Sequence, residues 1–497
     1  MYYRNARKAT IPLTFCLCIV AWQAWVFGQE TLIPVNPGPM TPAKKTAFQW
    51  VDDNNLRLAS WNDQIWAFAE LALQEFKSSA LLADQLERAG FRVTRGVSGM
   101  PTAFIAEYGS GQPIIGILAE YDALPSLSQK AIPAQEPVNA GTPGHGCGHN
   151  VFAIGSLGAA MAVKDVMTQH NIAGTIRLYG TPAEENYSGK TYMARDGAFD
   201  DLSAALHWHP GTTTGVTLSS NFALNGVEIE FFGKTAHASG APWDGRSALD
   251  AVELTNIAMN YLREHVRPSS RIHCVTTNGG GAANVVPEYA KVWYMVRDQD
   301  RQGVEYLFQR LLKCAEGAAL QTETTFKVNI LEGTWNLLIS ESGSKIMYSN
   351  LLLVGPPRFT DQEQAFARAI QSEMKLPEKG IASGIEPMRP SGPPAGGSTD
   401  VSDVSWITPT IGLSVALAPI GTPGHHWSTV CCSGMSIGHK SAAVAAKTIA
   451  ATALDLIEVP ELLQRIVAEW KEKTKNIPYR SAIPKGQNPP LFRPPVH

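Results

Sequence analysis

Residues 113–125 read Pro-Ile-Ile-Gly-Ile-Leu-Ala-Glu-Tyr-Asp-Ala-Leu-Pro, an apolar run that ends in two carboxylates. A strand of a sheet that is covered on both faces is apolar along its whole length, so the run predicts a buried strand over Pro113–Ala119. Open α/β sheets hold their chemistry at the carboxyl ends of such strands. Glu120 and Asp122 stand at that position, which makes this end of the strand the first candidate site.

Strand-like and helix-like segments alternate on both sides of this run. Before it, apolar residues at helical spacing predict helix within residues 44–90. The other expected elements are strands at Phe91–Val97, Thr102–Tyr108, Thr175–Tyr179 and Ser203–Leu206, with a helix from Val151 to about His170. This alternation predicts an α/β domain with a largely parallel sheet.

The pattern changes near Asn221 to the order strand, helix, strand, strand, helix, strand. That order is the split-βαβ, ferredoxin-like arrangement, and it interrupts the first domain. The sequence therefore predicts an α/β fold of two domains. They are a mostly parallel-sheet domain over residues 45–220 and 333–475, and an inserted ferredoxin-like domain over residues 221–332, followed by a Pro-rich tail at residues 476–497.

The N-terminus has the composition of an export signal. Arg4, Arg7 and Lys8 precede an apolar run that ends at Gly28. A basic start, a short apolar region and small residues at its end are typical of a secretory signal peptide over residues 1–28. We therefore expect a periplasmic or secreted protein without membrane association, or a membrane-anchored one if the signal is not cleaved.

Net charge and cysteine number argue against a nucleic-acid-binding protein and against a disulfide-rich fold. The chain of 497 residues has a net charge of −3, which gives no electrostatic case for binding nucleic acid. Seven cysteines are present, and Cys16 and Cys18 leave with the signal. The five that remain are too few, and odd in number, for a disulfide framework.

Four short clusters carry metal-binding side chains. They are Cys147 and His149 in the Gly-rich stretch 144–150, the pair Glu184-Glu185, His207 and His209, and His425 and His426. Three of them follow expected strands, so they meet at one edge of a parallel sheet. Thiolate, imidazole and carboxylate together suit one or two divalent ions, zinc or manganese. For stretch 144–150 taken alone, a Gly-rich loop around a buried thiol is the alternative.

The Glu184-Glu185 pair has a mechanistic interpretation. Neighbours in an extended backbone point opposite ways, so one carboxylate can bind metal while the other holds the attacking water. That division of labour is typical of metal-assisted hydrolysis. The alternative is a solvated acidic loop. Asp122 would either orient a histidine ligand or cap the next turn.

Two residues of the inserted domain are weaker candidates. His237, in Gly-Lys-Thr-Ala-His-Ala, follows the first strand of that domain. A lone histidine is more often structural than catalytic. Asn284 follows three glycines and could donate to a carbonyl or an oxyanion, or could simply form a turn.

Taken together, these motifs resemble the metal-dependent aminoacylase/carboxypeptidase-type amidohydrolases over about residues 45–485. The resemblance rests on Glu120–Pro125, Gly144–Asn150, Glu184-Glu185 with Ser188–Thr191, Trp208–Pro210, Gly245–Asp250, Asn284–Val286, Ser398–Val401 with Asp403–Trp406, and Gly421–Pro423 with His425. It implies a two-metal hydrolase. The small-molecule substrate would be an amide between an acyl or aroyl group and an amino acid, such as an N-acyl amino acid or p-aminobenzoyl-glutamate.

The resemblance also implies roles for individual residues. Glu184 would be the general base, and the implied metal ligands are Cys147, His149, Glu185, His207 and His425. The family has a ligand with His-x-x-Pro spacing, which falls on His207, whereas His209 directly precedes the proline. His237 and Asn284 would lie on a lid domain that mediates dimerisation in relatives and lends a histidine to a neighbour's site. We expect Arg297 to bind a substrate carboxylate.

The implied assembly is a homodimer or a heterodimer through the lid domain. Two alternatives to an acyl-amino-acid hydrolase stay open. One is a dipeptidase or carboxypeptidase that acts on small peptides. The other is an inactive relative that only binds, against which the intact pair Glu184-Glu185 argues.

Overall fold

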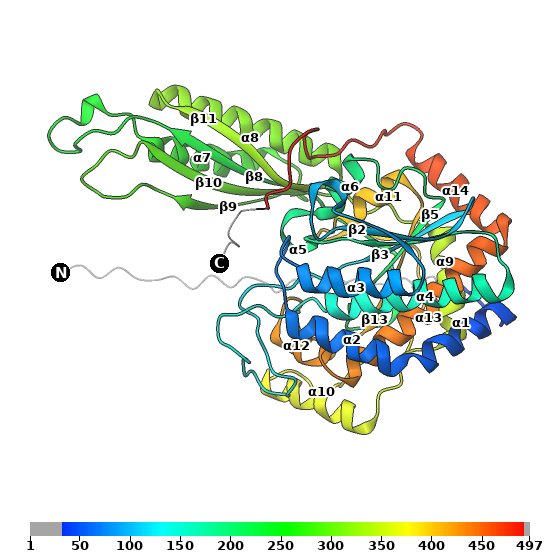
Figure 1. Ribbon diagram of the computed structural model, residues 1–497. Coiled ribbons are helices and arrows are strands. Elements are labelled where there is room, and N and C mark those ends of the chain that lie inside the picture. The colour runs from blue at the N-terminus through cyan, green and yellow to red at the C-terminus, as the bar shows by residue number, and fades with distance from the viewer. Residues whose placement is uncertain (1–31, 492–497) are drawn as a thin grey trace, which may run out of the picture.

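The structure is a computed structural model that describes residues 32–491. It contains a large α/β body and a smaller sheet with two helices that projects from it (Figure 1). The expected signal peptide at residues 1–28 lies outside the described residues.

The body is built on a seven-stranded sheet in the order β1-β2-β4-β3-β5-β13-β6. Its four central strands, β4, β3, β5 and β13, run parallel, whereas β1, β2 and β6 pair antiparallel at the edges. The strands are β1 (Arg92–Arg95), β2 (Phe104–Ser110), β3 (Ile114–Ala119), β4 (Gly174–Gly180), β5 (Ala204–Gly211), β6 (Gly215–Val216) and β13 (Thr410–Ala416). The predicted mostly parallel sheet is confirmed, and β3 is buried along its whole length.

Helices cover both faces of this sheet. Ile115 and Ile117 of β3 belong to the core shared with α1–α4, α9 and α13, whereas Ile114 and Leu118 face the side of α6 and α11. The helices of the body are α1 (Pro42–Asp53), α2 (Asn55–Phe68), α3 (Phe76–Arg88), α4 (His149–His170), α5 (Glu184–Tyr187), α6 (Gly189–Arg195), α9 (Glu341–Val354), α10 (Asp361–Glu373), α11 (Val401–Ile407), α12 (Trp427–Ser433), α13 (Ser436–Glu458) and α14 (Pro460–Thr474). A small parallel pair, β7 (Ser219–Asn221) and β12 (Gly392–Ala395), completes the body.

The projecting unit is a four-stranded antiparallel sheet in the order β11-β8-β10-β9. In chain order its elements are β8 (Ala223–Phe232), α7 (Ala248–Leu262), β9 (Arg271–Asn278), β10 (Tyr289–Asp298), α8 (Arg301–Thr322) and β11 (Thr325–Thr334). This is the predicted βαββαβ arrangement. Even-numbered residues of β10 are buried with α7 and α8, and its odd-numbered residues lie on the other, more open face.

The largest difference from the expected elements concerns β5. The sequence suggested a strand that ends at Leu206, but β5 continues to Gly211 because it pairs in parallel with β13 along that whole length. His207 and His209 are therefore strand residues rather than loop residues. They point to the same face and lie about 6.6 Å apart along the strand, since each residue rises about 3.3 Å.

Helix α4 is the one described helix that is long and apolar enough to cross a membrane, but 83% of its apolar window is buried inside the protein. It packs against the sheet and α13 as a core helix (Figure 1). All five cysteines of the described residues are free, in line with the absence of a predicted disulfide framework.

The C-terminal tail after α14 is irregular and docked. Trp335 donates to the carbonyl of Arg480 at 2.8 Å, and the Tyr479 hydroxyl donates to Asp403 at 2.7 Å. The tail therefore runs across the junction between the body and β11, as the red segment shows (Figure 1).

Candidate metal centre

The four predicted clusters meet at one pocket. It has a volume of about 380 Å³ and lies where the carboxyl ends of β4 and β5 face the base of the projecting sheet. Its lining from the body includes Cys147, Glu184, Glu185, His209 and His425. Its lining from the projecting sheet includes Leu224, Trp293, Met295, Arg297, Glu332 and Thr334.

Stretch 144–150 presents Cys147 to this pocket and places the buried His149 next to it. Gly148 has φ +76°, and a Cβ there would lie 2.9 Å from Leu417 and Pro210, so only glycine fits this turn. Helix α4 begins directly after it, at His149. His149 donates from Nδ1 to Asp122 at 2.8 Å, which directs its Nε2 towards the pocket.

Asp122 also fixes the glutamate pair. Its second oxygen accepts from the backbone N–H of Glu185 at 2.9 Å. The predicted role of Asp122 in orienting a histidine therefore matches its contacts, and the same carboxylate ties β3 to the turn that follows β4. Burial raises the pKa of Asp122, but His149 outweighs it and holds that pKa below its ordinary value.

The backbone at Glu184 and Glu185 is helical and not extended, contrary to our expectation. Ala183 has φ +62°, and Glu184 and Glu185 begin the one-turn helix α5. The buried carboxylate of Glu75 accepts from the Ala183 N–H at 2.9 Å and from the Thr102 hydroxyl at 2.9 Å. These bonds hold a backbone conformation that residues with a Cβ rarely adopt. Burial, together with Asp122, raises the pKa of Glu75 to about 8.

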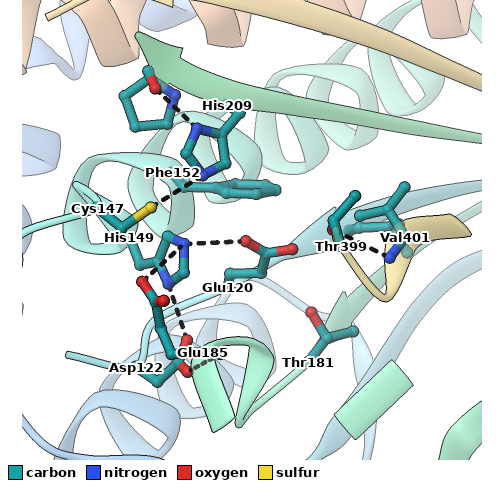
Figure 2. A network of polar contacts seen from close by, with 12 residues as sticks. Glu120, Asp122, Cys147, His149, Phe152, Thr181, Glu185, His209, Thr399 and Val401 are labelled. Carbon is teal, nitrogen blue, oxygen red and sulfur yellow. Dashed lines mark hydrogen bonds and ion pairs between the residues drawn. The ribbon is translucent and has the colours of Figure 1, made fainter. Parts of the chain in front are cut away.

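Three groups of side chains could each hold a metal ion, because within each group the ligand atoms lie within 4.8 Å of one another. They are Cys147, His149 and His209; Cys147, Glu185 and His425; and Glu120, His149 and Glu184. Figure 2 shows His209 beside Cys147, and Glu120 beside His149. The Cys147 sulfur lies 3.4 Å from His209 Nε2, and Glu185 lies 3.3 Å from His425 Nε2.

Unused atoms indicate that these groups suit metal ions. Within the described residues, the buried Nε2 of His149 and Oε1 of Glu185 make no hydrogen bond, although a Glu120 oxygen lies 3.2 Å from that Nε2. Such atoms are rare in the interior of a protein unless a ligand meets them. His209 donates from Nδ1 to the Pro210 carbonyl at 2.7 Å, which leaves its Nε2 for a metal. Thiolate, imidazole and carboxylate around two adjacent positions fit divalent cations.

The structure does not support the choice of His207 over His209. His209 belongs to a ligand group, whereas His207 belongs to none within the described residues. His207 lies deeper in β5, and a Cβ on the neighbouring Gly412 would come within 2.4 Å of its Nε2. Burial lowers the pKa of both His207 and His209 to about 4, so the choice between them rests on geometry and not on charge. The His-x-x-Pro spacing therefore selected His207, which does not line the pocket, instead of His209, which does.

The sequence did not single out one buried network next to this centre. The Lys190 ammonium lies 2.6 Å from Glu120 and 2.6 Å from Asp400. Burial raises the pKa of Glu120, but Lys190 and His149 outweigh it and keep that pKa below its ordinary value. Glu120 stood in the quoted strand-end motif. Lys190 stood in the stretch Ser188–Thr191 of the resemblance but was given no role of its own, because a lysine on a helix is usually exposed.

Of the predicted substrate residues, only Arg297 lines the pocket. His237 and Asn284 lie together in another part of the projecting unit, where the Ala238 N–H donates to the Asn284 carbonyl at 3.1 Å. The Nδ1 of His237 accepts from the backbone N–H of Gly240 at 3.0 Å. The structure therefore brings neither residue to the metal centre of its own chain.

The chain is similar in sequence to known metallopeptidases and amidohydrolases. Residues 219–323 match the peptidase dimerisation domain of the M20 family. The chain is 38% identical to one of the subunits of p-aminobenzoyl-glutamate hydrolase from Escherichia coli, over 89% of this chain and 98% of that protein. It is 28% identical to the mouse Xaa-Arg dipeptidase, over 88% of this chain and 96% of that protein.

A solved structure has the same fold. The YXEP protein of Bacillus subtilis, described as a dinuclear metal-binding peptidase of the M20 family, aligns with a TM-score of 0.54. The match covers 82% of this chain and 99% of that chain at 18% identity.

Proposed function

The chain belongs to the M20 family of metal-dependent peptidases and amidohydrolases, and we propose that it hydrolyses the amide bond between an acyl or aroyl group and an amino acid. One observation carries this proposal. Two ligand groups that share Cys147 meet beside Glu184, a carboxylate outside both groups that lines the same pocket.

The residues divide the chemistry as follows. The ligand groups around Cys147 would hold a divalent ion, which would supply polarisation of the carbonyl and a lower pKa for water. Glu184 accepts the proton of the attacking water and returns it to the nitrogen of the leaving amino acid. Asp122 keeps His149 in one tautomer through its 2.8 Å bond. Arg297, on the opposite wall, positions the carboxylate of the substrate.

We propose that the centre holds two ions, with Cys147, His149, Glu185, His209 and His425 as protein ligands. The groups Cys147-His149-His209 and Cys147-Glu185-His425 support two adjacent positions. Zinc is favoured by the thiolate and the imidazoles, whereas manganese is compatible with the carboxylate.

The test is a hydrolysis screen of the purified protein with N-acyl, N-aroyl and peptidyl amino acids. We expect turnover of acyl or aroyl amino acids that falls at least tenfold after chelation and returns with zinc or manganese. The metal content should be close to two ions per chain. Full metal content without hydrolysis of any substrate in the screen would contradict the proposal and favour a protein that only binds.

A dipeptidase is the second candidate function. The 28% identity to the mouse Xaa-Arg dipeptidase over most of both chains supports it. The same screen separates the two functions through its products. An acyl-amino-acid hydrolase releases a carboxylic acid and one amino acid, whereas a dipeptidase releases two amino acids.

The two histidines of β5 provide a direct test of the ligand set. We expect His209→Gln to weaken metal affinity at least tenfold, because Nε2 of His209 lies 3.4 Å from the Cys147 sulfur. The matched change His207→Gln should leave the metal content close to that of the parent. Metal titration followed by mass spectrometry under native conditions checks both variants. Loss of metal in the His207 variant alone would reverse our assignment.

We also propose that residues 221–332 form a lid and dimerisation unit inserted between residues 45–220 and 333–475. The match to a dimerisation domain at residues 219–323 supports association through this unit. Because the Escherichia coli relative is named as one subunit of a hydrolase, a heterodimer is the alternative to a homodimer. His237 and Asn284 would then serve a neighbouring protomer, and sedimentation analysis would give the assembly.

Export is a proposal that rests on residues 1–28. Their basic start and apolar run support a cleaved signal peptide and a periplasmic or secreted location. The mass of the mature protein tests it, because cleavage after Gly28 would leave Gln29 as the first residue. An intact N-terminus would favour a membrane anchor.

A further inference from the structure

The open face of the projecting sheet differs between its two ends. Farther from the pocket its charges are paired: Lys291 lies 3.3 Å from Glu228, and the Tyr289 hydroxyl donates to Glu230 at 3.0 Å. At the pocket end the same face carries Arg297 on β10 and Glu332 on β11. Neither charge of that end is used by the proton transfers proposed above.

Glu332 is a buried carboxylate without a direct partner. Only 6% of its surface is exposed. No described residue forms a hydrogen bond or an ion pair with it, although Arg297 is near enough to lower its pKa. It lies over Gly226, where a Cβ would come within 2.6 Å of its Oε1. Glycine therefore makes the space that the carboxylate occupies, and the chain keeps an acid in a place where burial is unfavourable.

The surroundings of Glu332 are also incomplete. Two other polar atoms of the pocket wall, Nε1 of Trp293 and Oγ1 of Thr334, are buried without a hydrogen-bond partner within the described residues. Native proteins satisfy nearly all such atoms through protein, water or ligand, so a group of them around one pocket forms a wall that suits a polar ligand. That ligand would meet one cationic side chain, Arg297, and one carboxylate, Glu332.

We propose that Glu332 receives a cationic group of the substrate, namely the side-chain ammonium or guanidinium of the amino acid that hydrolysis releases. Arg297 lies on the same face of the sheet as Glu332 and lines the same pocket. Its guanidinium binds the α-carboxylate of that amino acid. The preferred substrates are then acyl or aroyl derivatives of lysine-like or arginine-like amino acids. This inference rests on the proposed amide hydrolysis and names the substrate class of that site.

The raised pKa of Glu332 agrees with a carboxyl group that receives a cation from the substrate. Burial raises the pKa of Glu332 to about 8, Arg297 lowers it and Asp400 raises it further. Near neutral pH the carboxyl of the free enzyme is therefore largely protonated. A bound ammonium group ionises it and gains a charge-assisted hydrogen bond.

The experiment compares N-benzoyl-lysine with N-benzoyl-norleucine, whose side chain is similar in size and lacks the ammonium group. For the metal-loaded enzyme we expect kcat/KM to favour the lysine derivative by roughly ten- to hundredfold, mostly through KM. E332Q should bring that ratio close to one. E332K should invert the preference towards N-benzoyl-glutamate, because it would place a cation at the same position.

The matched control is E228Q, which changes a glutamate on the same face of the sheet, outside the pocket lining. It should keep the parent's preference for lysine. E332D is a second variant in case E332Q does not fold, and it should keep part of the preference. Calorimetry of free lysine and norleucine with the metal-loaded enzyme gives the same comparison without turnover.

The outcomes separate this inference from the proposed function. Equal kcat/KM values for the two derivatives in the parent enzyme would overturn the cation site and leave amide hydrolysis intact. A preference for lysine that persists in E332Q would also overturn it. If the enzyme hydrolyses no acyl or aroyl amino acid at all, the proposed function is wrong and the inference falls with it.

Discussion

Glu184→Gln is expected to lower kcat by roughly two to four orders of magnitude while two metal ions remain bound. The glutamine side chain has almost the same shape but cannot accept the proton of the attacking water. The metal should remain because the two groups that share Cys147 do not include Glu184. Steady-state kinetics and metal analysis of the same sample provide the measurement.

The contacts of the neighbouring carboxylates are the reason why we expect none of them to replace Glu184. Glu120 lies in the same ligand group but is held at 2.6 Å by the Lys190 ammonium. Glu185 belongs to the group with Cys147 and His425. Burial, together with Glu120 and Glu185, raises the pKa of Glu184, so this carboxyl binds a proton more readily than a solvated glutamate.

A matched glutamate controls for the charge change. Glu316 lies on the exposed side of α8, and Glu316→Gln should keep the parent's kcat. If Glu184→Gln retained more than a tenth of the parent's kcat, Glu184 would not be the general base. Loss of metal in that variant would instead make Glu184 a ligand.

The sequence predicted the fold well where periodicity and length were both clear. The wholly apolar run that became β3 indicated a sheet covered on both faces, and the element order between residues 227 and 331 indicated the ferredoxin-like insert. The length of β5 was missed, because its second half contains histidines and a proline that resemble a loop. Pairing with β13 supplied the hydrogen bonds that local sequence could not reveal.

For the site, residue type predicted the clusters but not their detailed geometry. Cys147, Glu185 and His425 lie far apart in the chain and still meet, because parallel strands end at the same edge. The choice between His207 and His209 depended on depth along a strand, which motif spacing does not encode. Glu75 and Lys190 were missed because their roles come from burial, and burial is a tertiary property.

The second large effect concerns stability. Lys190→Met is expected to lower the free energy of unfolding by about 3–5 kcal/mol, because it leaves Glu120 and Asp400 as buried carboxylates without a cation. The Lys190 side chain is 0% exposed and lies 2.6 Å from each of them. Activity per folded molecule should also fall, since Glu120 lies 3.2 Å from His149 Nε2. Denaturant unfolding monitored by circular dichroism measures the first effect.

A second buried lysine distinguishes loss of a charge pair from loss of the site. Lys44 lies 2.7 Å from Asp455, whose side chain is 16% exposed, and the pair is formed by α1 and α13, away from the pocket. Lys44→Met should therefore be less destabilising than Lys190→Met, because water reaches Asp455, and it should leave kcat unchanged. Adding Asp400→Asn to Lys190→Met should recover part of the stability by removing one unpaired carboxylate. Equal stability of Lys190→Met and the parent would show that the network near Glu120 is neutral rather than charged.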